Sequence, residues 1–278
     1  MIKIGQTHEL EVLRIVDFGV YLDAQNLGEI LLPRKHVPEG ITEGDFIYAF
    51  LYFDSEDRPI ATTQKPKAKV GEFAYLKMVA ASDVGAFLDW GLDKDVLVPF
   101  AEQHRPLEVD KYYLVYLYLD QKDGRITASS KVDKFLDDNK PHEFKENEAV
   151  NLIIANSTDL GFKAIVNHSH YGVLYKDEVF QRLSFGQDKK GFIKRIRPDG
   201  KIDLCLQGGQ ETRDKYVKII ENYLEKHEGF APVHDKSSPK LISEIFGMSK
   251  NAFKKSIGNM YKQKVITIAN DGIRLVEK

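Results

Sequence analysis

One short stretch, Asp17-Phe18-Gly19-Val20-Tyr21-Leu22, occurs again further along the chain and constrains the fold more than any other feature. An ungapped offset of 66 residues carries it onto Asp83-Val84-Gly85-Ala86-Phe87-Leu88. A second ungapped offset, of 76 residues, carries Gly85 onto Gly161 and Gly124-Arg125-Ile126 onto Gly200-Lys201-Ile202. The chain therefore holds three copies of one unit, and such repetition indicates an array of small, similar domains.

Each copy is predicted to form five short strands. In the first copy the strands are 9–16, 20–22, 29–32, 45–53 and 59–63. Within the fourth strand, residues 47–53 are apolar or aromatic throughout, and so is their copy at 113–119, which at this length favours a strand over a helix. Five short strands in about 65 residues, with a glycine where the first strand must bend, favour a small closed barrel.

The repeated motifs resemble the S1 RNA-binding domain. The resemblance rests on Phe18-Gly19-Val20-Tyr21-Leu22, on Gly28-Glu29-Ile30-Leu31-Leu32 and on the closing Gly-Arg/Lys-Ile strand. It implies an OB-fold barrel for each copy. The second copy has Val84 where S1 domains favour an aromatic residue. The third copy, with Leu160-Gly161-Phe162-Lys163-Ala164, loses both aromatic positions and keeps mainly the glycine and the last strands.

The C-terminal segment has a different, helical period. An amphipathic helix is expected over 210–227, followed by a helix that Ser238 caps and that Pro239 opens. After a tight turn, a basic helix over 250–262 places Phe253, Ile257, Met260 and Tyr261 on its apolar side, and a hairpin follows. This order of elements resembles a winged-helix domain, whose second helix holds the position that enters a DNA major groove in helix-turn-helix proteins.

The expected fold is therefore mainly β, with three tandem S1-like OB-fold barrels and a C-terminal α+β winged-helix domain. The predicted domains are 1–64, 65–131, 142–208 and 209–278, the last including the connecting helix. A spacer over 132–141 separates the second and third barrels. Val132, Phe135 and Leu136 lie at helical spacing before Pro141, which predicts a short spacer helix.

Charge is distributed unevenly along the chain, although the total is only −2. Residues 1–64 hold 5 basic and 11 acidic side chains, for a net charge of −6. Residues 65–131 and 132–209 are neutral, 210–231 carry −1, and 232–278 hold 9 basic and 4 acidic side chains, for +5. A nucleic-acid ligand is therefore expected mainly on the C-terminal half.

The candidate nucleic-acid-binding residues fall into three groups. Aromatic side chains on the second and third strands of an OB barrel offer platforms on which unstacked bases lie. Basic side chains after the third strand, in a strand of the third copy and on the basic helix would contact phosphates. The residues are Phe18, Tyr21, Arg34 and His36 in the first copy, Lys189, Lys190, Lys194, Arg195 and Arg197 in the third, and Lys250, Lys254 and Lys255 in the last helix. Packing of Tyr21 and a merely solvated basic strand are the alternatives.

The second copy is interpreted differently. It keeps Phe87 and Trp90 near its corner but surrounds them with acids, namely Asp83, Asp89, Asp93 and Asp95. Because such a rim repels phosphate, we expect this copy to be structural or to contact protein.

No catalytic residue, metal site or cofactor is expected. The single metal-like spacing, His168-Ser169-His170, lies at a predicted strand turn without a cysteine or carboxylate pair nearby. Cys205, the one cysteine, lies in an apolar strand, which favours a core residue in a reducing compartment. No leader peptide and no run of 18 apolar residues is found, so a cytoplasmic protein without a membrane span is expected.

Three S1-like copies followed by a winged helix resemble the bacterial family of S1 and winged-helix proteins typified by conserved virulence factor B. The resemblance lies in 17–22, 194–206 and 247–275, and it implies a non-enzymatic, RNA-binding regulator of gene expression. The alternative is a DNA-binding transcriptional regulator that uses its winged helix on duplex DNA and its barrels to dock protein partners. A metal-dependent nuclease is a third hypothesis, which the dispersed acidic residues disfavour.

Overall fold

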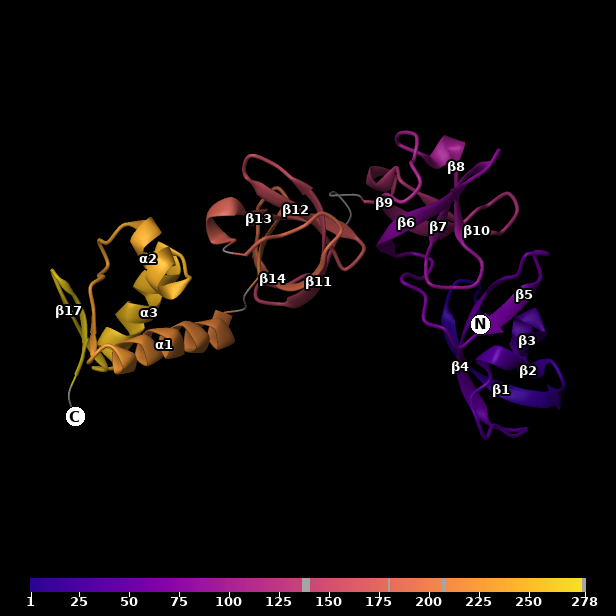
Figure 1. Ribbon diagram of the computed structural model, residues 1–278, viewed down its shortest axis with the longest axis horizontal. Helices are drawn as coiled ribbons and strands as arrows, with labels where there is room; N and C mark the ends of the chain where they lie inside the picture. The colour runs from indigo at the N-terminus through magenta and orange to yellow at the C-terminus, as the bar shows by residue number, and fades with distance from the viewer. Residues whose placement is uncertain (137–140, 180, 207–208, 277–278) are drawn as a thin grey trace. The chain divides into compact units, whose positions relative to one another are not determined.

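The computed structural model of the protein describes residues 1–136, 141–179, 181–206 and 209–276 (Figure 1). The chain divides into two compact units, Met1–Asp137 and Asp138–Lys278. The first unit contains two closed five-stranded barrels, and the second contains a third barrel and a small domain of helices and a three-stranded sheet. The predicted fold class, three barrels followed by a winged helix, is confirmed.

The first barrel follows the expected five-strand pattern. Buried aliphatic side chains alternate with outward ones along its strands, and Leu10, Val12, Val20, Leu22 and Leu32 lie in its core. The fourth strand closes the barrel by pairing with the first, and the third and fifth strands pair in parallel. The strands are β1 (Thr7–Val16), β2 (Gly19–Asp23), β3 (Glu29–Pro33), β4 (Phe46–Phe53) and β5 (Pro59–Thr62).

The second and third barrels repeat this topology, as the offsets of 66 and 76 predict. The second consists of β6 (Phe73–Ala81), β7 (Gly85–Asp89), β8 (Val96–Pro99), β9 (Tyr112–Leu119) and β10 (Ile126–Ser129). The third consists of β11 (Ala149–Ser157), β12 (Gly161–Val166), β13 (His170–Tyr175), β14 (Asp188–Ile196) and β15 (Ile202–Cys205). The first strand of every barrel has an irregular register at the same place, between Val12 and Arg14, Met78 and Ala80, and Ile154 and Asn156. Such a shift bends the strand and fixes its pairing.

The glycine shared by all three copies is required by close backbone packing. Gly19, Gly85 and Gly161 have φ values of 158°, 154° and 152°. A Cβ atom at these positions would lie 2.2, 2.3 and 2.0 Å from the carbonyl oxygens of Leu32, Val98 and Leu174 on the neighbouring strand. No side chain fits there, which explains why the third copy keeps the glycine while its aromatic positions change.

The first two barrels are joined by an aromatic junction. Phe50 and Tyr52 lie on the outer side of β4, and Trp90 from the second barrel covers both rings, with centroid distances of 5.6 and 6.4 Å. Trp90 is only 3% exposed, and its indole nitrogen donates to the carbonyl oxygen of Lys94. Burial is the first cause that raises the pKa of Tyr52, to about 12. Trp90 therefore belongs to the junction and not to a base-stacking platform.

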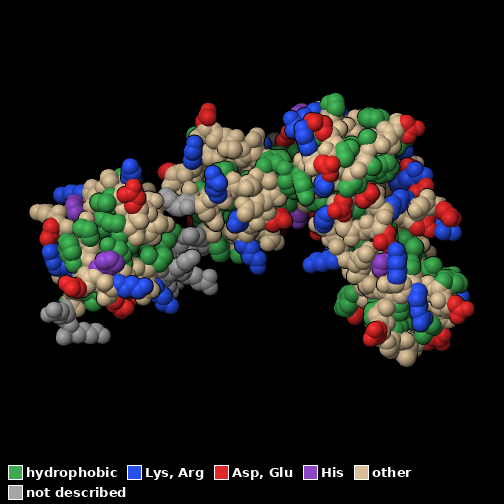
Figure 2. Space-filling view, in the orientation of Figure 1, with side chains coloured by type: hydrophobic (Ala, Val, Ile, Leu, Met, Phe, Trp, Pro, Cys, Tyr) green, Lys and Arg blue, Asp and Glu red, His purple; other side chains and the backbone are tan. Residues whose placement is uncertain are grey.

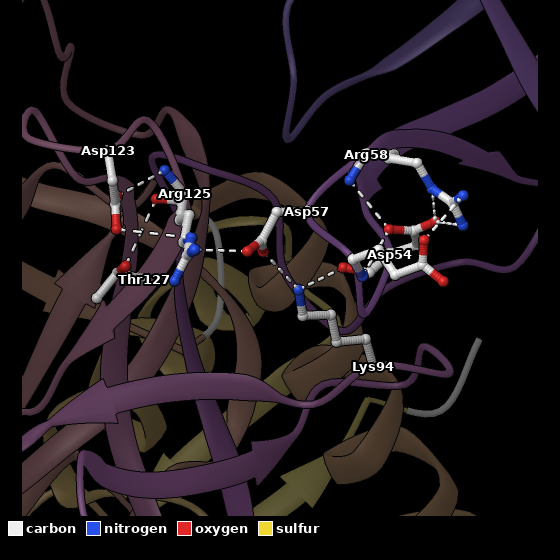
Figure 3. A network of polar contacts seen from close by, with 8 residues as sticks. Asp54, Asp57, Arg58, Lys94, Asp123, Arg125 and Thr127 are labelled. Atoms are coloured by element: carbon white, nitrogen blue, oxygen red, sulfur yellow. Dashed lines mark hydrogen bonds and ion pairs between the residues drawn. The ribbon is translucent and has the colours of Figure 1, made fainter.

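A polar network lies beside this junction (Figure 3). Asp57, in the β4–β5 turn of the first barrel, accepts from Arg125 of the second barrel at 2.5 Å and from Lys94 at 3.2 Å. Asp93 of the second barrel accepts from Lys35 at 2.6 Å and lies 3.1 Å from Nε2 of His36. The hydrogen bond from Lys35 lowers the pKa of Asp93. These contacts give the two barrels a fixed arrangement.

The spacer after the second barrel is helical, but as one 3-10 turn. It is η4 (Val132–Phe135), and residues 137–140 of the predicted spacer lie outside the described residues. Phe135 stacks on Tyr116 of β9, with ring centroids 4.1 Å apart, and lies 5.5 Å from the ring of Tyr118. Tyr116 and Tyr118 correspond to Phe50 and Tyr52 at the offset of 66, so the same outer pair of a barrel is again covered by an aromatic ring.

The C-terminal domain forms as the sequence predicts, with one additional strand. Helix α1 (Gly209–Lys226) precedes α2 (Pro239–Phe246) and α3 (Lys250–Lys262), and the hairpin is β17 (Ile266–Ala269) with β18 (Gly272–Leu275). Ser238 and Ser249 cap α2 and α3 by accepting from Leu241 N and Ala252 N. The additional strand, β16 (Phe230–Ala231), pairs with β18.

Candidate nucleic-acid interface

The outer face formed by the second and third strands is the usual oligonucleotide-binding face of an OB barrel. The strand ladders place equivalent residues of the three barrels at matched positions on this face. Tyr21 pairs with Leu31, Phe87 with Leu97, and Lys163 with Val173. On the other side, the same three residues pair with Arg14, Ala80 and Asn156 of the first strand. The three faces can therefore be compared residue by residue.

On the first barrel, the face holds aromatic rings and a cation that is already paired. Phe18 is 58% exposed and meets Tyr21 edge to face, with centroids 6.4 Å apart. The guanidinium of Arg14 lies 3.8 Å from the centroid of the Tyr21 ring and donates to Glu29 at 2.9 Å. The hydrogen bond to Glu29 also raises the pKa of Arg14. Tyr21 therefore does not pack in the core, and the cation on its ring is neutralised by Glu29.

The remaining candidates of the first barrel lie in η2 (Arg34–His36), which follows β3. Arg34 is exposed, and no ion pair to it is found within the described part of the chain. His36 is 8% exposed and faces Asp93 of the second barrel. The position of His36 assigns it to the junction, where a nucleic acid would not reach it.

On the third barrel, the face contains a pocket of about 430 Å³. A second aromatic–cation pair lines it: Nζ of Lys163 lies 3.4 Å from the centroid of the Tyr171 ring. Unlike Arg14, Lys163 has no ion pair to any described residue. The other lining residues come from the β11–β12 loop, from β13 and from the β14–β15 turn, and include Asp159, Leu160, His170, Val173 and Lys201. These loops and strands are the ones that bind ligands in OB folds.

On the second barrel, Ala80 occupies the position that Arg14 holds in the first, so this position carries no cation. Val84 and Phe100 are 52% and 59% exposed, and Phe87 lies between Ala80 and Leu97 on the neighbouring strands. Two of the four acids predicted to form a rim are paired: Asp89 accepts from Lys67 at 2.6 Å, and Asp93 accepts from Lys35. The matched positions Ala80, Phe87 and Leu97 are apolar, so they offer no charge to a phosphate.

The basic strand of the third barrel, β14, is only partly available to a ligand. Lys194 pairs with Glu178 at 2.5 Å, and Arg197 pairs with Asp203 at 2.7 Å and also donates to Tyr175. The register shift between Ile193 and Arg195 leaves Lys194 and Arg195 both exposed, where strict alternation predicted opposite faces. Lys189, Lys190 and Arg195 have no ion pair within the described residues, so they are the members of the group with a charge to offer.

Helix α3 presents a basic face, as predicted. Lys254 and Lys255 are exposed, and no ion pair to them occurs in the described residues, while Lys250 donates to the carbonyl oxygen of Lys236 at 3.3 Å. Phe253, Ile257 and Met260 are buried in the core of the domain. Tyr261 was expected among them, but it is 56% exposed. Seven residues after Lys254, it lies close to the basic face, because two helical turns span about seven residues.

Arg14, Lys163, Tyr171 and Lys201 were missed by the sequence analysis. Lys201 lines the pocket while pairing with Asp199 at 3.3 Å. Tyr171 lies on the third strand of its barrel, whereas the aromatic candidate Tyr21 of the first copy lies on the second strand. The offset of 76 aligns Tyr171 with Asp95, so alignment with the better copies conceals it.

Two absences complete the description of the site. Among the described residues, no group of three or more His, Cys, Asp or Glu side chains is placed to hold a metal ion. Likewise, none of the helices in the described ranges is both long enough and apolar enough to cross a membrane.

Family models match three segments of the chain. The S1 domain matches residues 4–64 and 70–131, and the CvfB-like winged helix domain matches residues 218–275. Both are nucleic-acid-binding types of domain, and they correspond to the first two barrels and to the C-terminal helices and sheet.

Similar proteins cover nearly the whole chain. Conserved virulence factor B of Staphylococcus epidermidis (strain ATCC 12228 / FDA PCI 1200) is 29% identical over 297 residues, which is 99% of this chain and 95% of the relative. Conserved virulence factor B of Staphylococcus aureus (strain USA300) is 27% identical over 292 residues, with the same coverage. A crystal structure of a multidomain protein with nucleic acid binding domains from Streptococcus pneumoniae is 23% identical and covers 98% of both chains, with a TM-score of 0.41. The chain is therefore similar over nearly its whole length to proteins named conserved virulence factor B, and it contains segments that match the S1 domain and the CvfB-like winged helix domain.

Proposed function

We propose that this protein is a non-enzymatic RNA-binding protein that regulates gene expression and takes single-stranded or structured RNA as its ligand. The observation that carries the proposal is the pocket on the third barrel, which contains an aromatic ring beside an ammonium group that has no counter-ion among the described residues. Its volume of about 430 Å³ lies within the range of small-molecule sites. An unstacked base with part of its sugar-phosphate backbone is the ligand that this chemistry fits.

The pocket combines the two interactions that single-stranded nucleic acids use. A base gains about 1–3 kcal/mol by stacking on an aromatic side chain, irrespective of its identity. Lys163 lines the pocket without an ion pair to a described residue, so it can contact a phosphate next to that base, and each neutralised phosphate releases counter-ions. RNA is preferred over duplex because bases are accessible for stacking only when they are unpaired.

The basic face of α3 supplies a second contact within the same unit of the chain. Lys254, Lys255 and the exposed Tyr261 can contact the backbone of one RNA molecule whose base occupies the pocket. Linking two weak sites makes the second contact intramolecular, so affinity rises without a new interface.

Fluorescence anisotropy with the full chain tests the proposal. The ligands are a labelled single-stranded RNA, the DNA of the same sequence and the two duplexes, all at one stated salt concentration. Tightest binding of single-stranded RNA, weakened by Tyr171→Ala, supports the proposal. The exposed lysines of α3 favour one alternative, a DNA-binding regulator. Tightest binding of duplex DNA, lost on changing Lys254 and Lys255 but not Tyr171, would establish that alternative instead.

A separate incubation tests the absence of catalysis. Labelled RNA incubated with the pure chain and Mg²⁺ or Mn²⁺ should stay intact. Cleavage that one point substitution in this chain abolishes would overturn the non-enzymatic part of the proposal and leave the binding part standing.

A further inference from the structure

A second surface, away from the oligonucleotide-binding faces, lies on β1 and β4 of the first barrel. The aromatic rings of Phe46 and Tyr48 are 63% and 67% exposed, and Leu13 is 38% exposed. Glu11 lies directly opposite Phe46 on the paired strands, and Glu9 directly opposite Tyr48. Since directly opposite side chains point to the same side of a sheet, about 4.5–5.5 Å apart, these residues form one continuous face. We name it the acidic aromatic face.

The acidic aromatic face begins where the junction ends. The outer side chains of β4 are Phe46, Tyr48, Phe50 and Tyr52, and Trp90 covers the last two while the first two stay exposed. Packing with the second barrel therefore explains only half of this aromatic row.

The carboxylates of the face lack cationic partners. Glu9 accepts a hydrogen bond from the Tyr48 hydroxyl, which raises the pKa of Tyr48. Glu43 extends the face and accepts from the backbone N–H of Ile15 at 3.2 Å. No ion pair to Glu9, Glu11 or Glu43 occurs within the described residues, and residues 1–64 carry a net charge of −6. Such a surface repels phosphate and attracts cations.

The other barrels show that this combination is not needed for folding. At the offset of 66, Phe46 and Glu11 correspond to Tyr112 and Lys77, and Lys77 pairs with Asp110 at 2.7 Å. At the further offset of 76, the same two positions hold Asp188 and Ile153. Carboxylates beside exposed aromatic rings are thus a property of the first barrel alone among the three copies.

We propose that the acidic aromatic face docks an arginine-rich segment of a partner protein. A guanidinium group stacks flat on an aromatic ring and at the same time donates two parallel hydrogen bonds to a carboxylate. The face offers both groups side by side, as Phe46 with Glu11 and as Tyr48 with Glu9. Lysine has no planar group to stack and a compact, strongly hydrated charge, so it fits this arrangement less well.

The test measures binding of labelled nona-arginine and nona-lysine peptides to the full chain by anisotropy, at about 0.1 M salt where weak long-range attraction is screened. The wild-type chain should bind nona-arginine more tightly than nona-lysine. A cation on one exposed ring contributes about a two- to fivefold gain in affinity, so Phe46→Ala with Tyr48→Ala should weaken nona-arginine binding about tenfold. The preference over nona-lysine should disappear with it.

Tyr112→Ala is the matched control, because it removes the equivalent exposed ring of the second barrel, which is 51% exposed. It should change peptide affinity less than about twofold. Unchanged binding of nona-arginine to the double variant, or an equal loss in the control, would overturn the proposal. Loss of RNA binding by the double variant would instead assign the face to the RNA interface. A wild-type dimer that the double variant converts to a monomer would assign it to a second copy of the chain.

Discussion

The first and third barrels present the same strand pairs on their oligonucleotide-binding faces, yet only in the third is the cation on the tyrosine ring without an ion pair to a described residue. Arg14 lies on the Tyr21 ring in the first barrel, and Lys163 lies on the Tyr171 ring in the third. Glu29 neutralises Arg14, whereas Lys163 has no ion pair to a described residue. The ladder of a barrel determines where its face lies, and one neighbouring carboxylate determines whether that face can attract phosphate.

The same contrast separates structural and binding roles along the chain. The outer aromatic pairs of the first and second barrels are covered by Trp90 and Phe135. The corresponding residues of the third barrel are Phe192 and Lys194, and Lys194 pairs instead with Glu178. In the view of Figure 2, acidic and basic side chains are interspersed over the barrels and do not form one stripe. Individual pairings, and not overall charge, therefore decide which barrel has a charge available to a ligand.

The largest effect is expected from a substitution that removes a structural contact between the first two barrels and leaves the proposed RNA pocket unchanged. Trp90→Ala deletes a buried side chain that two rings of the first barrel contact, and it should lower the free energy of unfolding of the first two barrels by about 3–5 kcal/mol. Chemical denaturation followed by fluorescence or circular dichroism measures this. RNA affinity should stay within about twofold, because the pocket lies in the other unit. Phe135→Ala, which removes a partly buried ring, is the control and should cost less.

The comparison of the two faces is tested most directly by removing each tyrosine. Tyr171→Ala should weaken binding of single-stranded RNA by about 5- to 150-fold, because a stacked base contributes about 1–3 kcal/mol. Tyr21→Ala should cost less than about threefold, since the ion pair with Glu29 holds Arg14 on the Tyr21 ring, whereas no described carboxylate holds Lys163 on the Tyr171 ring. Anisotropy titrations at one salt concentration measure both. A larger loss for Tyr21 would reverse the assignment of roles.

A smaller effect is expected from the basic helix. Changing Lys254 and Lys255 together to Ala should reduce the slope of log affinity against log salt by about 2 at most, since each phosphate contact contributes about 1. The loss should be about equal for RNAs of different sequence, because phosphate contacts carry no base information. Lys236→Ala is a control on the same domain, outside α3. An unchanged slope in the folded double variant would show that α3 faces a protein.

The smallest effect is expected from a substitution that leaves the cation of the first barrel without an ion pair, as in the third barrel. Glu29→Gln removes the carboxylate from Arg14 and keeps the size of the side chain, so the guanidinium becomes available to a phosphate. RNA affinity should rise by about two- to fourfold, and the salt slope for single-stranded RNA should steepen by about 0.7. Glu39→Gln, which removes an acid outside this face, serves as the control for net charge. An equal rise in both variants would mean that only the total charge of the barrel matters.

The fold could be predicted because repetition and backbone sterics leave few choices. The corner glycines, the strand positions and the caps Ser238 and Ser249 are local features, and their consequences can be derived from neighbouring residues. The winged helix was likewise predicted from the helical spacing of its apolar residues and from its hairpin. The strand β16 was not predicted, because two residues are too few to show a pattern.

The site was harder to predict because ion pairs depend on the folded neighbours. Arg197 and Asp203 meet across paired strands, and Lys194 meets Glu178 across 16 residues, so a count of basic residues over 189–201 overestimates the available charge. The residues next to His36 in the sequence do not indicate that it is buried. Its burial results from the packing of the two barrels. Tyr171 was not predicted because the aromatic ring of the third copy lies on the third strand, β13, instead of the second.

The covered aromatic pairs also bear on how a chain of this kind can lengthen. A barrel that carries the ring covering the barrel before it brings its own connector when its gene segment is duplicated, as Trp90 does for β4. The outer pair of the second barrel is covered in another way, by Phe135 of the connector that follows it. The third barrel is therefore not needed to cover β9, and its sequence can diverge without exposing that aromatic pair.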